Sequence, residues 1–277
     1  MTTLDEALPD STGRLRRFRA AYGRHRAAEG RGAGGEQELL SLPYVRVGPH
    51  ARQWSVRART FEALQSAVLA PLARALARPV RVLDVGAGNG WLCYRLARIG
   101  HRALALDVRA DATDGLGAAS PYAAHLPVMF GRVAGSFDAL PFDRRAFDLA
   151  VFNASLHYAL DLDAVVAEAA RVVAPGGVVA ILDSPFYPTA EAGDRMVAEK
   201  RRSAARTFGV LADDLTGLPF VEYLTSERLA TATAALGLSW RRHRVRYPLF
   251  YEARPLAARL LGRRVPSRFD LWEARVP

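Results

Sequence analysis

Residues 80–92 read VRVLDVGAGNGWL, an apolar run followed at once by three glycines. The run is short and rich in β-branched residues, as is typical of a strand buried on both faces of a sheet. Gly86, Gly88 and Gly90 can adopt positive φ and let another group approach the backbone closely. Apolar residues at helical spacing follow in 91–100, WLCYRLARIG. The stretch therefore predicts a strand, a glycine turn and a helix. This arrangement suits an anionic or polar ligand, although a tight turn that binds nothing has the same pattern.

The composition indicates a globular protein with a basic bias. The 277 residues suffice for one large core, or one core and a small appendage, and the formal net charge is +10. Lys200 is the only lysine, and the arginines are scattered along the chain. We therefore interpret the charge as a compositional bias and expect no nucleic-acid partner. Cys93 is the only cysteine, which excludes an intrachain disulfide and a cysteine-based zinc site. The sequence shows neither an apolar signal segment nor a run of membrane-spanning length, and we expect a cytoplasmic protein.

Three parts are predicted along the chain. Residues 1–35 are polar and are expected to form a flexible N-terminal segment that contains a short basic helix over 14–28, with 36–79 as a helical cap. From residue 80 to 277, strands and helices alternate, as in a parallel α/β sheet. The stretches 188–222 and 248–266 are longer than simple connections require. We therefore predict that they are insertions that act as a lid, together with 36–60.

The glycine spacing differs from that of the dinucleotide fingerprint. Trp91 stands where the third glycine of G-x-G-x-x-G would be, and the observed spacing is acidic-x-G-x-G-x-G, beginning at Asp84. The next predicted strand, HRALALDV, ends in Asp107, whose carboxylate can accept hydrogen bonds from both ribose hydroxyls of a nucleoside. A helix cap or an exposed turn residue is the alternative for Asp107.

Four signatures in order resemble the class I S-adenosylmethionine-dependent methyltransferases, in the branch that includes ubiquinone and menaquinone biosynthesis enzymes. They are LDVGAGNGWL, the acid Asp107, SFDALPFDRRAFDLAVFNASLHY and ARVVAPGGVVAILDSP. The resemblance implies a Rossmann-like α/β fold, with a seven-stranded sheet of order 3-2-1-4-5-7-6, an antiparallel strand 7 and helices on both faces. It also implies S-adenosylmethionine as cofactor, S-adenosylhomocysteine as product, and transfer of methyl to an oxygen, nitrogen or carbon atom of a small molecule. RNA or protein methylation and a non-catalytic cofactor-binding scaffold remain alternatives, and the sequence leaves the oligomeric state open.

The resemblance also assigns positions in this chain to the cofactor. The methionine part would lie against Gly86, Ala87, Gly88, Gly90 and Asn153, with Asp84 anchoring the loop. The ribose would lie at Asp107 and Val108, and the adenine would lie at Ser136, Phe137 and Asp138. Ser136 stands where the family commonly has an aspartate. Asp138 either compensates for that change or caps the turn that follows.

Candidates for the chemistry follow the fourth and fifth predicted strands. His157 is either a general base or a support for the cofactor loop, and Tyr158 is expected to wall the pocket. Asp183 either orients an acceptor hydroxyl or caps the next helix. In the N-terminal cap, Arg57 would pair with the methionine carboxylate, and Trp54 either closes the pocket or packs in the core. No cluster of residues predicts a metal site.

Overall fold

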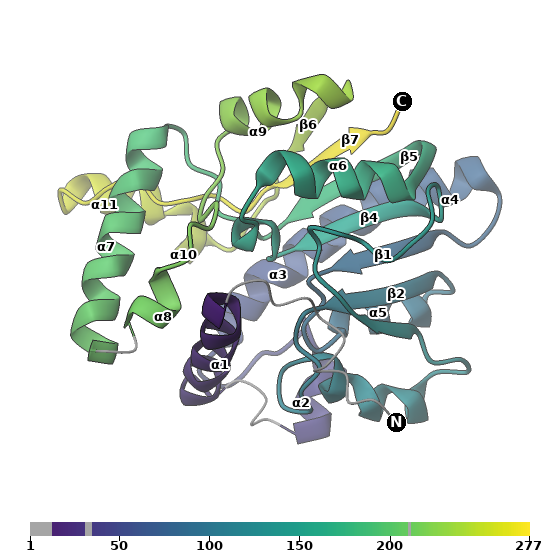
Figure 1. Cartoon of the computed structure of the whole chain (residues 1–277), viewed down its shortest axis with the longest axis horizontal. Helices are drawn as coiled ribbons and strands as arrows, with labels where there is room; N and C mark the ends of the chain where they lie inside the picture. Colours follow the sequence, from purple (N-terminus) through teal and green to yellow (C-terminus); the bar gives the residue numbers. More distant parts are fainter. Residues whose placement is uncertain (1–12, 31–34, 210–211) are drawn as a thin grey trace.

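A seven-stranded sheet forms the centre of the computed structural model, which describes residues 13–30, 35–209 and 212–277 (Figure 1). The strand order is β3-β2-β1-β4-β5-β7-β6. The strands β1 to β5 pair in parallel, and β7 is antiparallel to both β5 and β6. The predicted order and the antiparallel seventh strand are therefore confirmed. The strands are β1 Arg81–Val85, β2 Arg102–Asp107, β3 Gly131–Ala134, β4 Phe147–Asn153, β5 Val173–Leu182, β6 Trp240–His243 and β7 Leu271–Arg275.

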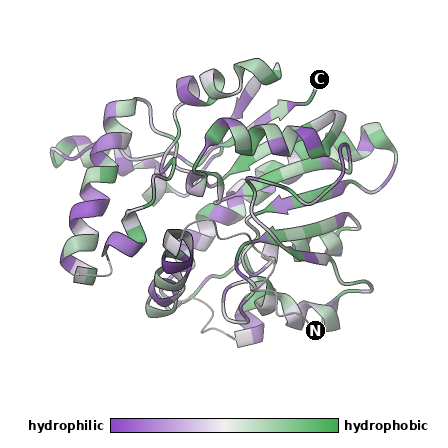
Figure 2. Ribbon diagram, viewed as in Figure 1, coloured by the Kyte–Doolittle hydropathy of each residue, from purple (hydrophilic) through white to green (hydrophobic). Residues whose placement is uncertain are grey.

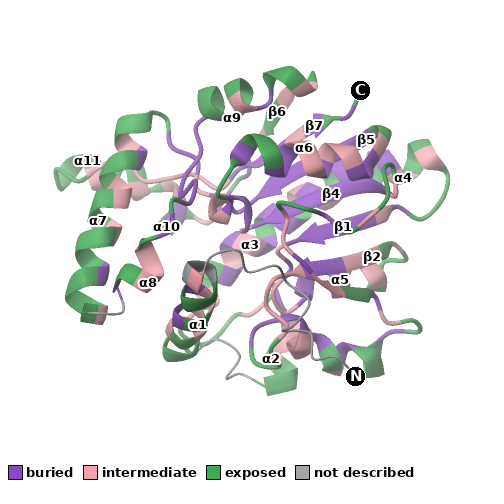
Figure 3. Cartoon of the chain, viewed as in Figure 1, coloured by how far each residue is buried: buried purple, intermediate pink, exposed green. Residues whose placement is uncertain are grey.

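The central strands are buried on both faces, as their apolar sequences predict. All seven residues of β4 are buried, and so are the last four residues of β1. Successive side chains of a strand point to opposite faces, so Leu83 packs in the core on one face of the sheet while Val82 packs on the other. Figures 2 and 3 show this hydrophobic, buried sheet between helices that are more polar and more exposed on their outer sides.

Helices cover both faces of the sheet and extend beyond it to one side (Figure 1). Residues of α6 and α9 pack in the core of one face, and residues of α3, η2, α4 and α5 pack in the core of the other. The helices before the sheet are α1 Gly13–Ala28, α2 Gly35–Ser41, α3 Ala51–Leu64, the π-helical turn η2 Gln65–Leu69 and α4 Ala70–Leu76. The others are α5 Trp91–Arg98, the 3-10 segments η3 Leu116–His125, η4 Leu156–Tyr158 and η6 Ala234–Leu236, α6 Leu162–Val172, α7 Ala190–Phe208, α8 Ala212–Thr216, α9 Ser226–Ala232, α10 Leu249–Glu252 and α11 Arg254–Leu260.

The N-terminal segment contains the helix that the sequence predicts over 14–28. Residues 1–12 and 31–34 lie outside the described residues, but 13–28 form helix α1. Phe18 and Tyr22 lie four residues apart on α1, and both rings pack against Tyr158, with Phe18 also against Phe220. Residues four apart share one face of a helix, so these aromatic contacts hold α1 on the rest of the chain.

Candidate active site

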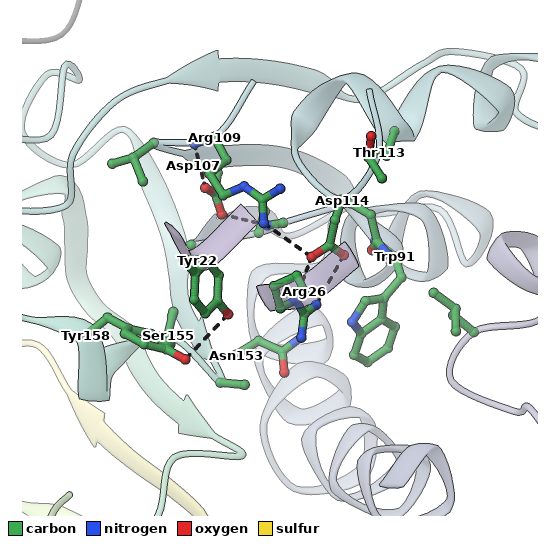
Figure 4. Close-up of a pocket in the computed structure, with 18 of the residues that line it drawn as sticks. Tyr22, Arg26, Trp91, Asp107, Arg109, Thr113, Asp114, Asn153, Ser155 and Tyr158 are labelled. Carbon is green, nitrogen blue, oxygen red and sulfur yellow. Dashed lines mark hydrogen bonds and ion pairs between the residues drawn. The ribbon is translucent and has the colours of Figure 1, made fainter. Parts of the chain in front are cut away.

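A cavity of about 380 Å³ lies at the carboxyl ends of β1, β2 and β4, with side chains of α1, α2 and α3 over it (Figure 4). Open parallel sheets bind ligands at this edge, in the crevice where the strand order reverses. Twelve of the sixteen site residues predicted from the sequence line the cavity: Trp54, Arg57, Gly86, Ala87, Gly88, Asp107, Val108, Ser136, Phe137, Asp138, Asn153 and Tyr158. The other four, Asp84, Gly90, His157 and Asp183, are not among the lining residues.

The glycines of the loop after β1 serve different purposes. The N–H groups of Gly86 and Ala87 donate to the carbonyl of Leu106, at 2.8 and 2.9 Å, which fixes the loop to β2. A Cβ atom on Gly86 would overlap the side chain of Ser155, so this position is glycine for packing. A Cβ atom on Gly88 would meet only the carbonyl oxygen of Asp114, at 3.6 Å. Gly88 lines the cavity with φ +55°, so its missing side chain leaves room for a ligand.

Asp107 stands at the end of β2 with both carboxylate oxygens facing backbone donors. Its Oδ2 accepts from the N–H of Gly88 at 2.7 Å, and its Oδ1 accepts from the N–H of Arg109 at 2.8 Å. Burial raises the pKa of Asp107, and these two backbone hydrogen bonds oppose that effect. A carboxylate oxygen has a second lone pair, so Asp107 can position the glycine loop and still accept hydrogen bonds from a ligand in the cavity.

Asp84 lies behind the glycine loop instead of in the cavity. Its side chain is fully buried, and Oδ1 has no hydrogen-bond partner among the described residues. The thiol of Cys93 contacts Oδ2 at 3.7 Å. Burial, with a smaller contribution from the charge of Asp107, raises the pKa of Asp84 to about 8. The carboxyl group is therefore largely protonated at neutral pH.

We expect Asp84→Asn to change how the stability of the protein depends on pH. A carboxyl group whose pKa is raised in the folded state binds a proton that the unfolded chain has released. Its contribution to the free energy of unfolding is therefore full below the ordinary pKa of aspartate and is lost as pH rises from about 4 to about 8. Urea unfolding without ligand should show the wild type losing stability relative to Asp84→Asn, by up to about tenfold in the unfolding constant per pH unit. Parallel curves for the two proteins would show that Asp84 is ionised throughout.

The stretch assigned to adenine carries a carboxylate at Asp138 instead of at position 136. The hydroxyl of Ser136 donates to Oδ2 of Asp138 at 2.7 Å, and the Asp138 N–H lies 3.4 Å from the same hydroxyl oxygen. Both residues line the cavity. The pair therefore places a hydroxyl and a carboxylate, each able to accept a hydrogen bond, on the wall of the cavity.

Two polar groups of the cavity, on Asn153 and Arg57, make no side-chain hydrogen bond to the described residues. Oδ1 of Asn153 is buried without a hydrogen-bond partner among the described residues. The guanidinium of Arg57 lies 5.0 Å from the centre of the Trp54 ring. Burial lowers the pKa of Arg57, and the negative charge of Asp183 opposes this. The structure thus directs one hydrogen-bond acceptor and one cation, each suited to a charged ligand, toward the same cavity.

Of the three candidates for catalysis, only Tyr158 lines the cavity. Its hydroxyl lies 3.4 Å from that of Tyr22, and burial raises the pKa of Tyr158 well above the ordinary value (Figure 4). Burial, with Lys200 and Arg57 adding to it, lowers the pKa of His157 to about 3. Asp183 has φ +52°, and its Oδ1 accepts from the hydroxyl of Thr60 at 2.8 Å. His157 is therefore neutral at physiological pH, and Asp183 is joined to the N-terminal cap through α3.

Helix α1 supplies lining residues that the sequence did not point to. Arg26 makes two hydrogen bonds to the carboxylate of Asp114, at 2.6 and 3.1 Å, and Arg19 donates to the carbonyl of Val108 at 2.7 Å. Arg109 approaches Asp114 from the other side at 3.4 Å, so two arginines share this carboxylate (Figure 4). The four-residue spacing of Phe18 and Tyr22 was the sequence signal for this helix face.

The predicted lid segments contribute unequally. The cap 36–60 lines the cavity with seven residues: Glu36, Glu38, Leu39, Leu42, His50, Trp54 and Arg57. The stretch 188–222 contributes Phe220 alone, and none of the lining residues comes from 248–266. Within the described ranges, no group of three or more histidine, cysteine, aspartate or glutamate side chains is placed to hold a metal ion, and no helix is long and apolar enough to cross a bilayer.

The family model described as a methyltransferase domain matches residues 83–181, from β1 through β5. This segment carries the glycine loop, Asp107 and Asn153. Residues 83–181 therefore belong to the methyltransferase domain family, which supports a class I S-adenosylmethionine-dependent methyltransferase. Among curated relatives, the malonyl-[acyl-carrier protein] O-methyltransferase of Erwinia billingiae is 32% identical over 99 residues, which are 36% of this chain and 37% of that protein. The match thus spans little more than a third of the relative's length.

Solved structures match the fold over about three quarters of this chain, at low sequence identity. The YcgJ protein of Bacillus subtilis matches 77% of this chain and 99% of its own, at 17% identity and a TM-score of 0.54. The [4+2]-cyclase SpnF matches 75% of this chain and 79% of its own, at 23% identity and a TM-score of 0.51. A cyclase with this fold shows that the fold does not determine the reaction, so the reaction must be argued from the site.

Proposed function

We propose that this protein transfers the methyl group of S-adenosylmethionine to an ionised oxygen of a small acyl acceptor, such as a carboxylate. One observation carries the proposal. The cavity at the strand ends combines open space at Gly88, the carboxylate of Asp107 and the unpartnered Oδ1 of Asn153. These features fit a nucleoside joined to an amino acid, since they offer acceptors for hydroxyl and ammonium groups along one groove.

Each part of the cofactor has residues of this chain to hold it. The ribose hydroxyls would donate to Asp107, and the adenine would lie by Ser136, Phe137 and Asp138. The ammonium group would donate to Asn153, and the methionine carboxylate would pair with Arg57. When bound, S-adenosylmethionine supplies an electrophilic methyl group on a sulfonium, with a good leaving group already in place.

The nature of the acceptor is inferred from the bases near the cavity. A neutral hydroxyl needs a general base whose pKa lies near the working pH, whereas a neutral amine attacks with its own lone pair and loses its proton afterwards. His157 has a pKa of about 3 and does not line the cavity, and the pKa of Tyr158 is too high for it to be ionised. An acceptor that carries its own negative charge needs no base. Positioning by the cavity walls then supplies much of the catalysis.

The names of two relatives agree with an oxygen acceptor. The malonyl-[acyl-carrier protein] O-methyltransferases of Erwinia billingiae and Yersinia pestis are named for transfer to oxygen. Their similarity to this chain covers about a third of it, in the part that carries the cofactor residues. The proposed acceptor therefore rests on the chemistry of the cavity, and the names add only agreement.

A matched pair of acceptors tests the proposal. A malonyl thioester has a free carboxylate, and the corresponding acetyl thioester lacks it. With methyl-labelled S-adenosylmethionine, we expect label to transfer to the malonyl compound alone, in a product that mild base hydrolyses to labelled methanol. Transfer to both thioesters or to neither, with cofactor bound, would overturn the carboxylate acceptor. Label in RNA or protein would favour those alternatives, and cofactor binding without transfer to any acceptor would favour a scaffold.

His157→Asn provides an independent prediction. If the acceptor is already ionised, the variant should retain kcat within about threefold of the wild type, with a rate nearly flat from about pH 6 to about pH 8, because no group must lose a proton. Loss of a general base would instead lower kcat by about 10²- to 10⁴-fold. A fall of that size, with unchanged cofactor affinity, would assign His157 as the base.

A further inference from the structure

The tip formed by α10, α11 and the loop after α11 exposes apolar side chains. We name six of these the apolar tip: Leu249, Phe250, Leu256, Leu260, Leu261 and Val265. Leu249 is 88% exposed and Leu260 is 77% exposed. Single exposed leucines are common, but six large apolar residues within 17 positions are a concentrated patch. None of them lines the cofactor cavity.

The apolar tip is held outward by a well-connected base. Arg254 stacks on the ring of Tyr251, 3.5 Å from its centre, and donates to the carbonyl of Ser267 at 2.7 Å. Arg268 pairs with Glu252 through two hydrogen bonds of 2.9 Å, and Arg264 pairs with Glu199 of α7 at 2.6 Å. These contacts fix the orientation of α10 and α11. The exposure of the leucines is therefore a property of the fold and not of a detached helix (Figures 1 and 3).

The part of the chain that carries the apolar tip is rich in positive charge. Residues 241–268 contain nine arginines and one acidic residue, Glu252, which is already paired with Arg268. Five of the arginines are exposed and make no ion pair among the described residues: Arg241, Arg244, Arg246, Arg259 and Arg263. On α11, Leu256 and Leu260 lie one turn apart, and Arg259 is beside them on the helix surface. Apolar and cationic side chains thus share the exposed surface of α11.

We infer that the apolar tip and its arginines bind the surface of an anionic lipid bilayer. Exposed side chains beside an amphipathic helix can enter the headgroup region while arginines contact lipid phosphates. Leu249 and Leu260 protrude, and a bilayer accepts protruding apolar groups without a matching pocket. Two copies of this chain in a symmetric contact would set arginines against arginines, since the same patch would face itself. The observed charge therefore favours lipid over a second copy.

Sedimentation with lipid vesicles tests the inference on the full chain. Wild-type protein should sediment with vesicles of phosphatidylcholine and phosphatidylglycerol, much less with phosphatidylcholine alone, and should be released by salt. Leu256→Ser with Leu260→Ser should weaken binding by at least about tenfold for each leucine. Arg259→Gln with Arg263→Gln should weaken it by about fivefold for each arginine.

Val128→Ser is the matched control, since Val128 is 79% exposed on a different part of the surface, between η3 and β3, and its loss should leave vesicle binding unchanged. Retained binding of S-adenosylhomocysteine would show that the tip variants are folded. Folded wild-type protein that ignores anionic vesicles would overturn the inference. A dimer in light scattering that the leucine variant converts to a monomer would also overturn it, and would assign the tip to contact between copies.

Discussion

Gly88→Val is expected to abolish measurable binding of S-adenosylmethionine, with a loss of at least about a hundredfold in affinity, or ~3 kcal/mol. Gly88 lines the cavity, and a Cβ atom there meets no protein atom closer than the carbonyl oxygen of Asp114 at 3.6 Å. The valine side chain would therefore occupy ligand space without colliding with the protein. Equilibrium dialysis with labelled cofactor measures the loss.

Gly100→Val separates loss of ligand space from backbone strain. Gly100 has φ +88° after α5, a Cβ atom on it would meet no described atom within 4 Å, and it does not line the cavity. Valine at either position has a similar cost for positive φ, about 1–2 kcal/mol. Gly100→Val should thus lower stability as much as Gly88→Val does, while the affinity for S-adenosylmethionine stays unchanged. A folded Gly88→Val variant that binds normally would place the ligand elsewhere.

Asp107→Ala is expected to weaken cofactor binding by about 10²-fold or more. Two charge-assisted hydrogen bonds from ribose hydroxyls to a carboxylate contribute roughly 1.5–3 kcal/mol each before compensation by water. The structure adds a second effect, because the N–H groups of Gly88 and Arg109 lose their acceptor in the variant. Stability should therefore fall as well, by about 1–3 kcal/mol.

Asp111→Ala is the matched control for Asp107→Ala. Asp111 also accepts from two backbone N–H groups, those of Thr113 at 3.1 Å and Asp114 at 3.0 Å, but it does not line the cavity. Asp111→Ala should therefore lower the stability of the protein without a comparable loss of affinity for the cofactor. Titration calorimetry and thermal unfolding of both variants measure the two effects. Equal losses of affinity would show that Asp107 acts through loop structure alone.

The centre of the fold was predictable because its signals are local. A buried apolar run, three glycines and an amphipathic helix follow one another in 80–100, and each depends on residues close in sequence. The strand order was predicted from the resemblance, and the pairing of β7 with β5 and β6 confirms it. The basic, amphipathic character of the stretch EARPLAARLLGRR, 252–264, is visible in the sequence, but the helical spacing of its leucines fits burial as well as exposure.

The place of a site residue was predictable where that residue ends a strand. The role of a residue was less predictable where it depends on how deeply the side chain is buried. Asp107 and Asn153 end their strands, so their place at the cavity follows from topology. His157 has the residue type and position of a base, but its burial and its charged neighbours come from distant parts of the chain, including Lys200 of α7 and Arg57 of α3. The contact of α1 with Asp114 joins segments 88 residues apart, and the sequence has no local signal for it.

Titration calorimetry of S-adenosylhomocysteine into the full wild-type chain tests the assignment of the cofactor cavity most directly. We predict saturable binding of one ligand per chain, lost in Gly88→Val and retained in Gly100→Val. Protection from hydrogen exchange should appear in the glycine loop and around Asp107. Wild-type protein that is folded, yet shows neither heat of binding nor protection in these segments, would contradict the assignment.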